Sequence, residues 1–323
     1  MLYPLRFAPV FKERVWGGRR LARFFPDLPP GPIGEAWVLS DHPQGPTPVA
    51  NGPLTGETLS SLRSRLTPEQ DRALMGARGA AAGRDRFPLL FKLLDAQDDL
   101  SIQVHPSDDF PGLPPGEMGK SEMWVVLEAE PGARIVHGLA EGVTRDDLAR
   151  AVREGRTVEA MRFVTVRPGD VYYLPAGLVH ALGAGLMVAE IQQSSDTTYR
   201  LYDYDRLGLD GKPRELHIDQ ALACLSDAPP PAPDRLGPAE ANRWETVVSS
   251  PYFVTAHARC AGDWPQETDP GTFEVLMILS GAGAVSWAEG AETLAPGQAW
   301  LIPACLGSYR LAGEFEALRI RIP

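Results

Sequence analysis

The stretch Gly169-Asp-Val-Tyr-Tyr-Leu-Pro-Ala-Gly-Leu-Val-His180 decides the fold. It has the form G-x5-P-x-G-x2-H, in which the glycines and the proline set up a tight turn between two short runs of strand-forming residues. The pattern therefore predicts one strand that ends before Pro175 and a second that begins at His180, with the imidazole pointing inward.

Three residues upstream can join His180 in one site. Gln103 and His105 are two positions apart, so they share one face of a strand. Glu122 stands at the start of another β-rich run, Met123–Leu127. The four side chains offer two imidazoles, a carboxylate and an amide oxygen, which suits Zn²⁺ or a neighbouring divalent metal with coordination left open for a substrate. The alternative is that both histidines are satisfied groups inside a barrel that binds no metal.

The composition is that of a folded protein with many short elements. Of 323 residues, 44% are hydrophobic and 23% charged, and there are 32 glycines and 31 prolines, which favours β-structure over long helices. The net charge of −11 opposes non-specific binding to nucleic acid or an acidic membrane. The three cysteines form no disulfide framework, and no apolar run has membrane-spanning length, so we expect a cytoplasmic protein.

Turn residues divide the chain into short strands and a few helices. Capping patterns at Thr67 and Thr144 predict two helices, and a third is expected at Asp219–Leu225. The expected strands are Leu5–Phe7, Gly34–Ser40, Phe87–Leu94, Leu100–Val104, Met123–Leu127, Arg134–Val136, Phe163–Val166, Val171–Leu174, Leu186–Ile191, Tyr252–His257, Phe273–Leu279, Ala299–Ile302 and Leu318–Ile322.

A proline-rich linker, Ala228–Asp234, predicts a boundary between domains 1–230 and 235–323. The second domain is similar to the first, with His105 aligned to His257 and Glu122 to Glu274 after a shift of 152 positions, and Arg167–Ala176 aligned to Ala295–Ala304 after a shift of 128. At the metal positions, however, Thr255 replaces Gln103 and Ser308 replaces His180. The expected fold is mainly β, with two tandem cupin (jelly-roll) barrels, a small helical insert, and metal in the first barrel alone. Two unrelated β-domains are the alternative.

Four stretches carry a resemblance to a known family: Leu100–Pro106, Gly119–Trp124, Gly169–His180 and Gln192–Arg206. Together they resemble the type I mannose-6-phosphate isomerases (phosphomannose isomerases), particularly their short bacterial form within the cupin superfamily. Weaker similarities lie at Arg14–Gly18, Gly34–Trp37 and Arg214–His217.

The resemblance implies a zinc-dependent aldose–ketose isomerase of carbohydrate metabolism, which interconverts mannose 6-phosphate and fructose 6-phosphate. It implies one zinc per chain and a sugar phosphate as the partner, and the acidic net charge leaves no nucleic-acid or membrane partner to be expected. By motif position, the implied metal ligands are Gln103, His105, Glu122 and His180. The implied catalytic arginine is Arg200, and the lysine two residues before the glutamate ligand is Lys120.

The chemistry itself requires groups of these kinds. Moving a carbonyl between two carbons passes through an enediolate, whose negative charge must be stabilised while a side chain transfers a proton. Arg200 suits the role of a fixed cation but could bind the phosphate instead. Lys120 could act as acid and base or contact the phosphate. Asp196 is a second acid–base candidate, or else it orients Arg200.

Other functions of the same constellation remain open. The chain could isomerise another sugar phosphate, or it could be a metal-dependent sugar-binding or regulatory cupin without catalysis. The presence of Lys120, Asp196 and Arg200 favours an enzyme, since a binding protein needs no group to move a proton. A cupin dioxygenase is disfavoured because such enzymes use histidine-rich iron sites, whereas an amide stands here in place of one imidazole.

Overall fold

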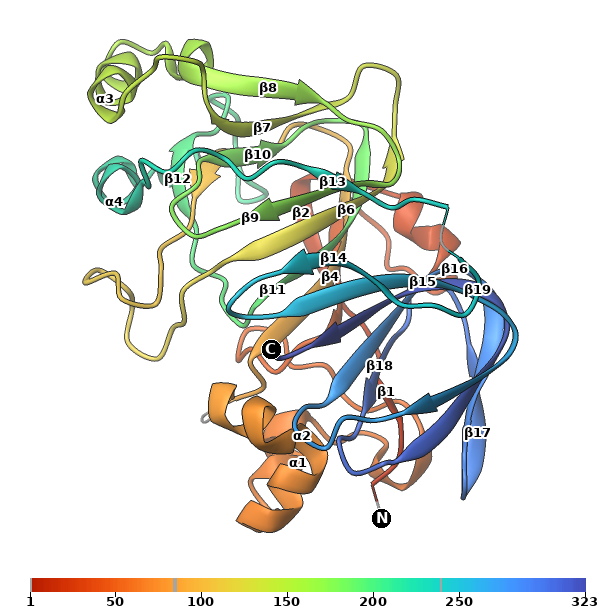
Figure 1. The fold of residues 1–323 in the computed structure, drawn as a ribbon. Helices are drawn as coiled ribbons and strands as arrows, with labels where there is room; N and C mark the ends of the chain where they lie inside the picture. Colours follow the sequence, from red (N-terminus) through yellow and green to blue (C-terminus); the bar gives the residue numbers. More distant parts are fainter. Residues whose placement is uncertain (1, 84–85, 239) are drawn as a thin grey trace. The chain divides into compact units, whose positions relative to one another are not determined.

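A computed structural model of the chain describes residues 2–83, 86–238 and 240–323. The protein is mainly β, as predicted, and its strands form antiparallel sheets (Figure 1). The chain divides into two compact units. Unit 1 comprises Met1–Val10, Trp37–Phe91 and Asp234–Pro323, and unit 2 comprises Phe11–Ala36 and Lys92–Pro233.

Unit 2 contains two sheets that face each other. One has the strand order β12-β5-β10-β7-β8, and the other includes the order β9-β6-β11-β4-β2-β3. Strands β3 and β4 continue into unit 1. The strands are β2 (Val10–Gly18), β3 (Ile33–Leu39), β4 (Leu89–Ala96), β5 (Ile102–Val104), β6 (Glu122–Ala129), β7 (Arg134–Leu139), β8 (Met161–Thr165), β9 (Asp170–Leu174), β10 (His180–Leu182), β11 (Leu186–Gln193) and β12 (Tyr199–Tyr202).

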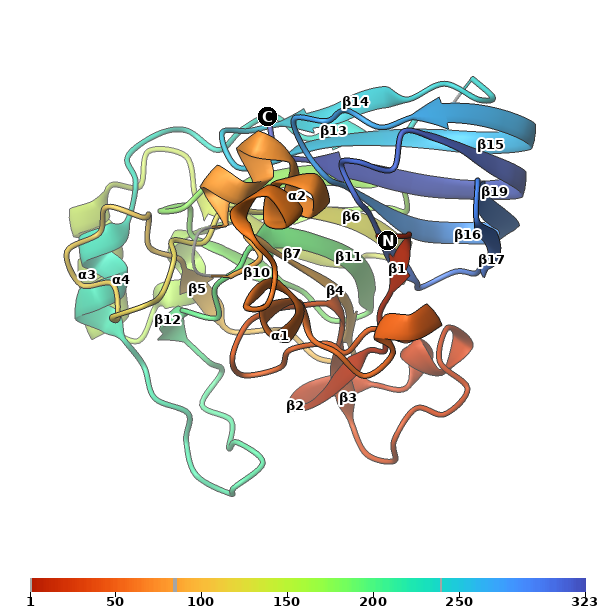
Figure 2. The ribbon, with the colours of Figure 1, turned by 90° about the horizontal axis from the view of Figure 1, so that it is seen from below.

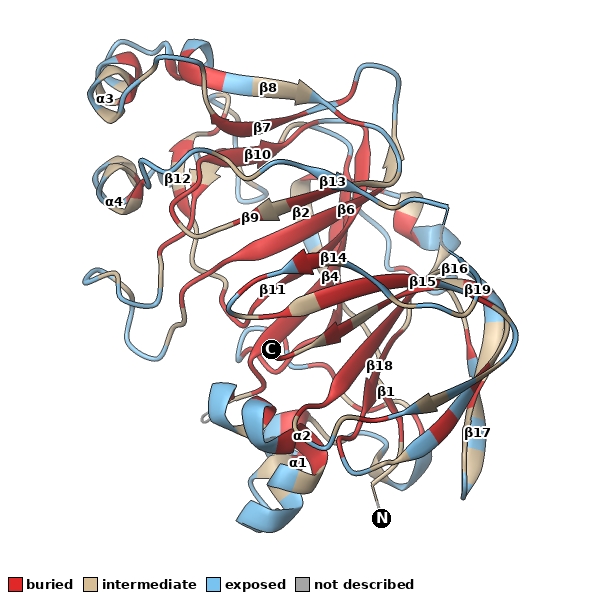
Figure 3. Cartoon of the chain, viewed as in Figure 1, coloured by how far each residue is buried: buried red, intermediate tan, exposed pale blue. Residues whose placement is uncertain are grey.

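A continuous apolar core fills the space between these two sheets. Trp124 and Val188 from one sheet meet Ile135 and Leu182 from the other, and all four side chains are buried. The outer face of the five-stranded sheet has a second cluster, in which Ile102 and Val136 pack with residues of two helices. These are α3 (Arg145–Arg153) and α4 (Ile218–Cys224), and a short 3-10 helix, η3 (Thr157–Ala160), follows α3. Figure 3 shows buried residues along these strands.

Unit 1 is built on one sheet with the order β1-β18-β16-β19-β15-β14, and β17 also pairs with β16. Long strands that run side by side dominate it, as Figure 2 shows for β15, β16 and β19. The strands of this sheet are β1 (Leu5–Arg6), β14 (Glu245–Ser249), β15 (Val254–Glu267), β16 (Glu274–Trp287), β17 (Gly290–Leu294), β18 (Ala299–Ile302) and β19 (Ser308–Arg321). The short strand β13 (Asp234–Arg235) lies outside this sheet. Its helices are α1 (Leu59–Arg63) and α2 (Pro68–Ala82).

The helix predictions are confirmed by the capping groups. Thr67 and Gln70 form a reciprocal capping box at the start of α2, and Thr144 and Asp147 form one at the start of α3. Each box satisfies two backbone N–H groups that the first turn leaves without partners. The predicted third helix corresponds to α4. The remaining short 3-10 helices are η1 (Arg20–Arg23) and η2 (Gly52–Leu54).

The predicted strands are present, but several extend further than predicted and five others were missed. Strands β15 and β16 each have 14 residues, because both continue past their apolar halves into arms rich in alanine, glycine and polar residues. The missed strands are β2, β12, β13, β14 and β17. In β2, the consecutive charges of Lys12, Glu13 and Arg14 hide the period-two pattern that marks a half-buried strand.

Candidate active site

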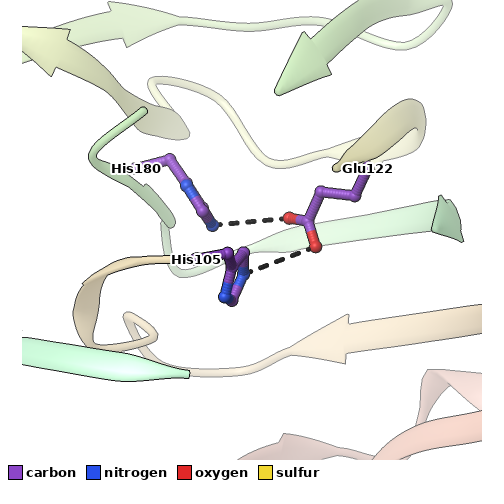
Figure 4. Close-up of side chains that lie close together, drawn as sticks. All are labelled: His105, Glu122 and His180. Atoms are coloured by element: carbon purple, nitrogen blue, oxygen red, sulfur yellow. Dashed lines mark ion pairs between the residues drawn. The ribbon is translucent and has the colours of Figure 1, made fainter. Parts of the chain in front are cut away.

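Three of the predicted metal ligands converge at one point of unit 2. His105 follows β5, Glu122 begins β6 and His180 begins β10, and one ligand atom of each lies within 4.8 Å of the others. Figure 4 shows the three side chains pointing toward one another. His105 Nε2 lies 3.5 Å from Glu122 Oε2, and His180 Nε2 lies 3.4 Å from Glu122 Oε1. The G-x5-P-x-G-x2-H turn brings the third ligand, His180, to the other two.

Backbone contacts orient both imidazoles. His105 Nδ1 lies 2.9 Å from the Thr197 carbonyl oxygen, and His180 Nδ1 lies 2.8 Å from the Leu178 carbonyl oxygen. A carbonyl only accepts, so each Nδ1 carries the hydrogen and each Nε2 presents a lone pair to the cluster. Carbonyl groups hold metal-binding histidines in this way in many proteins.

The protonation states also suit metal binding. Burial lowers the pKa of His105 well below its usual value, and Lys120 lowers it further. Burial likewise lowers the pKa of His180 to about 4, so both rings are neutral. For Glu122, burial and the nearby Glu190 raise the pKa to about 7. This carboxylate is therefore held at a cost that a bound cation would offset.

Gln103 lies beside the cluster with its nitrogen facing it. The amide Nε2 is 3.4 Å from His180 Nε2, while Oε1 accepts a hydrogen bond from Ser101 Oγ at 3.2 Å. A half-turn about the last side-chain bond would exchange the two atoms. Gln103 can therefore present an oxygen to a metal only after the Ser101 hydrogen bond is exchanged.

Lys120 places its ammonium group among the ligands. Its Nζ lies 3.0 Å from both His105 Nε2 and Glu122 Oε2, and the residue is only 4% exposed. A positive charge is thus already located where the two ligands converge. The other predicted role, contact with a phosphate, would require this side chain to reach away from the cluster.

Arg200 belongs to the same face as the ligands. Across three neighbouring strands, Arg200 on β12 pairs with Gln103 on β5, which pairs with His180 on β10, so the three side chains form a row. The buried Nε of Arg200 has no hydrogen-bond partner among the described residues. Burial lowers the pKa of Arg200, and Arg214 and Arg14 act in the same direction. An oxyanion would satisfy this guanidinium.

Asp196 lies close to the cationic groups of the site. Its charge raises the pKa of Arg14, Lys92 and Arg200 against the effect of burial. The structure thus brings Asp196 and Arg200 within electrostatic reach of each other. His217 contacts the backbone of Arg200, whose carbonyl accepts a hydrogen bond from the His217 backbone N–H at 2.8 Å.

Sequence reasoning missed a buried charged pair beside the ligands. Lys92 Nζ lies 3.0 Å from Glu190 Oε1, and both residues are at most 4% exposed. The other oxygen of Glu190 accepts a hydrogen bond from Trp124 Nε1 at 2.8 Å. Burial lowers the pKa of Lys92, but nearby carboxylates, Glu190 most strongly, raise it above its ordinary value. Lys92 therefore remains charged at any physiological pH.

The charged pair continues into a second pair. Lys92 Nζ is 4.0 Å from Glu35 Oε2, and Glu35 Oε1 accepts a hydrogen bond from Arg14 Nε at 2.6 Å. A usable signal was present in the sequence, since Lys92 and Glu190 are lone charges within otherwise apolar strand patterns. A lone charge at such a position is rarely buried without a partner.

Comparisons with known proteins agree on one family. The model of the phosphomannose isomerase type I catalytic domain matches residues 4–114. The chain is 37% identical over 320 residues to mannose-6-phosphate isomerase ManA of Bacillus subtilis, covering 98% of each chain. It is 35% identical over 324 residues to the mannose-6-phosphate isomerase of Streptococcus mutans, again covering 98% of each.

The chain belongs to the type I mannose-6-phosphate isomerases. The crystal structure of the Bacillus subtilis mannose 6-phosphate isomerase agrees with this, with a TM-score of 0.86, 34% identity and 99% of each chain covered. Family membership confirms the resemblance found in the sequence. It also confirms the prediction that the chain is an enzyme, a mannose-6-phosphate isomerase. Among the described residues, none of its helices combines the length and apolarity needed to cross a membrane.

The residues of the isomerase fit a divalent metal at the His105–Glu122–His180 cluster. Two neutral imidazoles and one carboxylate form a donor set that zinc prefers. Neither oxygen of Glu122 receives a hydrogen bond in favourable geometry from the described residues, although Lys120 forms an ion pair with one of them. Buried carboxylate oxygens are rarely left in that state.

Proposed function

We propose that this isomerase interconverts mannose 6-phosphate and fructose 6-phosphate through an enediolate, with one zinc per chain held by Gln103, His105, Glu122 and His180. The observation that carries the proposal is the convergence of two Nε2 lone pairs and the Glu122 carboxylate beside Lys120 and Arg200. Zinc at these ligands would supply a Lewis acid that stabilises negative charge on the sugar oxygens.

The chain's own residues account for the proton transfer and for charge stabilisation. We assign the proton transfer between the two sugar carbons to Lys120, because its Nζ is located where the ligands converge. As a neutral amine, Nζ would take the proton from one carbon, become the ammonium, and return the proton to the other carbon. Arg200 offsets the negative charge of the enediolate, since its guanidinium lies in the same row as Gln103 and His180 and its buried Nε–H finds no partner within the described parts of the chain. Asp196 orients Arg200 through its opposite charge.

The charged pair Lys92–Glu190 sets the electrostatics around the ligands. Glu190 raises the pKa of Glu122, whereas Lys92 and Lys120 lower it. The two lysines therefore favour the ionised carboxylate that a metal requires. Lys92 is buried and paired, so its contribution stays constant while substrate enters and leaves.

We also propose that the fold consists of two tandem cupin barrels, residues 1–230 and 235–323, of which the first is active. The strand registers support the repeat, because Glu122 pairs with Leu174 and the corresponding Glu274 pairs with Ile302. These pairs are related by the same shifts of 152 and 128 positions that the sequence indicated.

The second copy of the site is arranged in a way that opposes metal binding. Glu274 accepts a hydrogen bond from Tyr309 Oη at 2.7 Å and lies 3.6 Å from Arg319 and 3.8 Å from Arg321. His257 pairs with Leu318 on β19, whereas Arg319 pairs with Leu276, two residues from Glu274. Alternation along the strands thus places His257 and Glu274 on opposite faces. In this copy, the positive charges of Arg319 and Arg321 lie beside Glu274, where a metal would lie in the first copy.

The proposed substrate and location follow from the same site. A sugar phosphate is the small-molecule partner, and we propose that the protein works in the cytoplasm, where its three free cysteines would stay reduced.

The experiment that tests the proposal is isomerisation of fructose 6-phosphate by the purified chain. We expect mannose 6-phosphate as the product, loss of turnover after treatment with a chelator, and recovery when zinc is added back. A product other than mannose 6-phosphate would overturn the substrate assignment. Full turnover by rigorously metal-free protein would overturn the metal dependence.

A further inference from the structure

We propose that Asp108 and Gln193 form a bracket that holds the backbone on both sides of Lys120, and so positions its ammonium group in the active site. Both would be positioning residues, acting through Lys120 rather than on the substrate. The inference rests on the proposed function, specifically on the role assigned to Lys120.

The bracket is a closed set of hydrogen bonds around Lys120. The backbone N–H of Gly119 donates to Asp108 Oδ1 at 2.8 Å, and that of Ser121 donates to Gln193 Oε1 at 2.8 Å. The two side chains are joined, since Gln193 Nε2 donates to Asp108 Oδ1 at 3.2 Å and Oδ2 at 3.1 Å. The residues immediately before and after Lys120 are thus tied to one side-chain pair.

The chemistry of the partners fixes the orientation of the Gln193 amide. Its oxygen must face the Ser121 N–H, which only donates, and its nitrogen must face the Asp108 carboxylate, which only accepts. The reversed amide would place a donor against a donor and an acceptor against an acceptor. Gln193 is 1% exposed, so such mismatches would not be relieved by water.

Further contacts close the remaining freedom of the segment. The backbone N–H of Lys120 donates to the Pro106 carbonyl at 2.9 Å, directly after His105. Ser121 Oγ accepts from the backbone N–H of Ala176 at 3.1 Å, in the turn that leads to His180. A Cβ at Gly119 would lie 2.4 Å from Asp108 N, so the close approach needs glycine.

The consequence concerns rate rather than metal binding. The Nζ of Lys120 stands at the end of a long flexible side chain. A small shift of the Lys120 backbone therefore moves the ammonium relative to the ligands and the substrate. Misplacement by about 1 Å of a reacting group can cost about 10²-fold in rate. Asp108 and Gln193 contact neither His105 Nε2 nor His180 Nε2 in the described structure, so removing them should lower kcat and leave zinc content near one per chain.

A double-mutant cycle tests the inference. Gln193→Met keeps the approximate length of the side chain but removes the acceptor for Ser121, and it is made in the wild type and in a Lys120→Met background. We expect kcat to fall roughly 10- to 100-fold in the wild type and less than about twofold in the Lys120→Met background, because the lysine it positions is already absent.

Variants at the exposed end of the bracket guard against a folding failure. Asp108→Ala should lower kcat about 10-fold, whereas Asp108→Asn, which keeps an oxygen that accepts from Gly119 and Gln193, should stay within about threefold of the wild type. Asp109→Ala is the matched control, because Asp109 is also exposed and accepts from Ser107 Oγ outside the bracket. Its kcat should be unchanged.

The outcomes separate the bracket from the proposed function. Equal losses of kcat with and without Lys120, an unchanged kcat in Gln193→Met, or loss of zinc from it would overturn the bracket while leaving the function in place. If Lys120→Met itself kept full kcat, the role assigned to Lys120 would be wrong and the bracket would fall with it. An inactive wild type would contradict the proposed function.

Discussion

Replacing Lys92 by methionine should destabilise the isomerase in a manner that depends on pH. The substitution leaves Glu190 buried without its cation, which normally costs about 3 to 5 kcal/mol. At 3.0 Å and an effective dielectric constant of about 20, the lost attraction is roughly 5 kcal/mol before desolvation is counted.

In the Lys92→Met variant, Glu190 can take up a proton instead of staying charged and unpaired. The cost of that protonation makes the stability penalty depend on pH. With Lys92 present, its charge lowers the pKa of Glu190 even though burial raises it, and without Lys92 burial acts unopposed by that charge. Taking up a proton at pH 7 against the ordinary value of 4.5 costs about 3.4 kcal/mol, and at pH 5 about 0.7 kcal/mol. The penalty should therefore shrink as the pH falls.

Urea unfolding followed by circular dichroism measures this penalty. We expect Lys92→Met to lose about 3 kcal/mol at pH 7 and less than about 1 kcal/mol at pH 5, relative to the wild type at the same pH. The double variant Lys92→Met/Glu190→Gln should recover much of the loss at pH 7, since no charge remains to be buried. A penalty that is independent of pH, or unaffected by Glu190→Gln, would refute the reasoning.

Three other predictions concern Arg200, His137 and the pair His257 and Glu274. Arg200→Ala should lower kcat about 10² to 10³-fold while the zinc content stays normal. Arg200→Lys should recover part of the lost kcat, because the ammonium keeps the charge but not the planar shape. A raised KM with intact kcat in Arg200→Ala would show that Arg200 contacts the phosphate instead. Burial lowers the pKa of His137 to about 4 in the folded protein, against about 6.5 in the unfolded chain. The free energy of unfolding should therefore fall by up to about 3 kcal/mol between pH 6.5 and pH 4, as the unfolded chain takes up the proton first. His137→Phe should remove this part of the fall in unfolding curves recorded at acid pH. His257→Ala with Glu274→Gln should leave zinc content and turnover unchanged in metal analysis and rate assays. The Glu274 change should lower stability, because it leaves two partly buried arginines without their carboxylate. If the wild type bound a second zinc ion that this variant lost, the inactivity proposed for the second copy would be contradicted.

Local sequence patterns identified the helices and strands that contacts between neighbouring residues determine. The capping boxes at Thr67 and Thr144 start helices through contacts within four residues, so both helices could be predicted. The turn at Gly169–His180 fixes the start of β10 in the same way. Strand β2 and the outer halves of β15 and β16 could not be found, because pairing with neighbours distant in the sequence, rather than β-propensity, makes them strands.

The site residues also differ in whether a local sequence pattern reveals them. His105, Glu122 and His180 could be predicted because each stands at the end of a strand with a recognisable pattern. Glu190 and Lys92 were missed because their role exists only once β11 and β4 lie side by side. The orientation of the Gln103 amide toward Ser101 is likewise set by folded neighbours, and no spacing in the sequence reveals it.

The central claim is that isomerisation depends on a metal held at the His105–Glu122–His180 cluster, and Glu122→Gln tests it most directly. The amide keeps the shape of the side chain but removes the charge that completes the donor set. Glu128→Gln, further along β6 in an ion pair with Arg23, is the matched control. Zinc content after dialysis and turnover of fructose 6-phosphate are measured on both. The prediction is that Glu122→Gln loses bound zinc and at least about 10²-fold in turnover while the control keeps both. Retention of both by Glu122→Gln, or wild-type turnover without zinc, would contradict the claim.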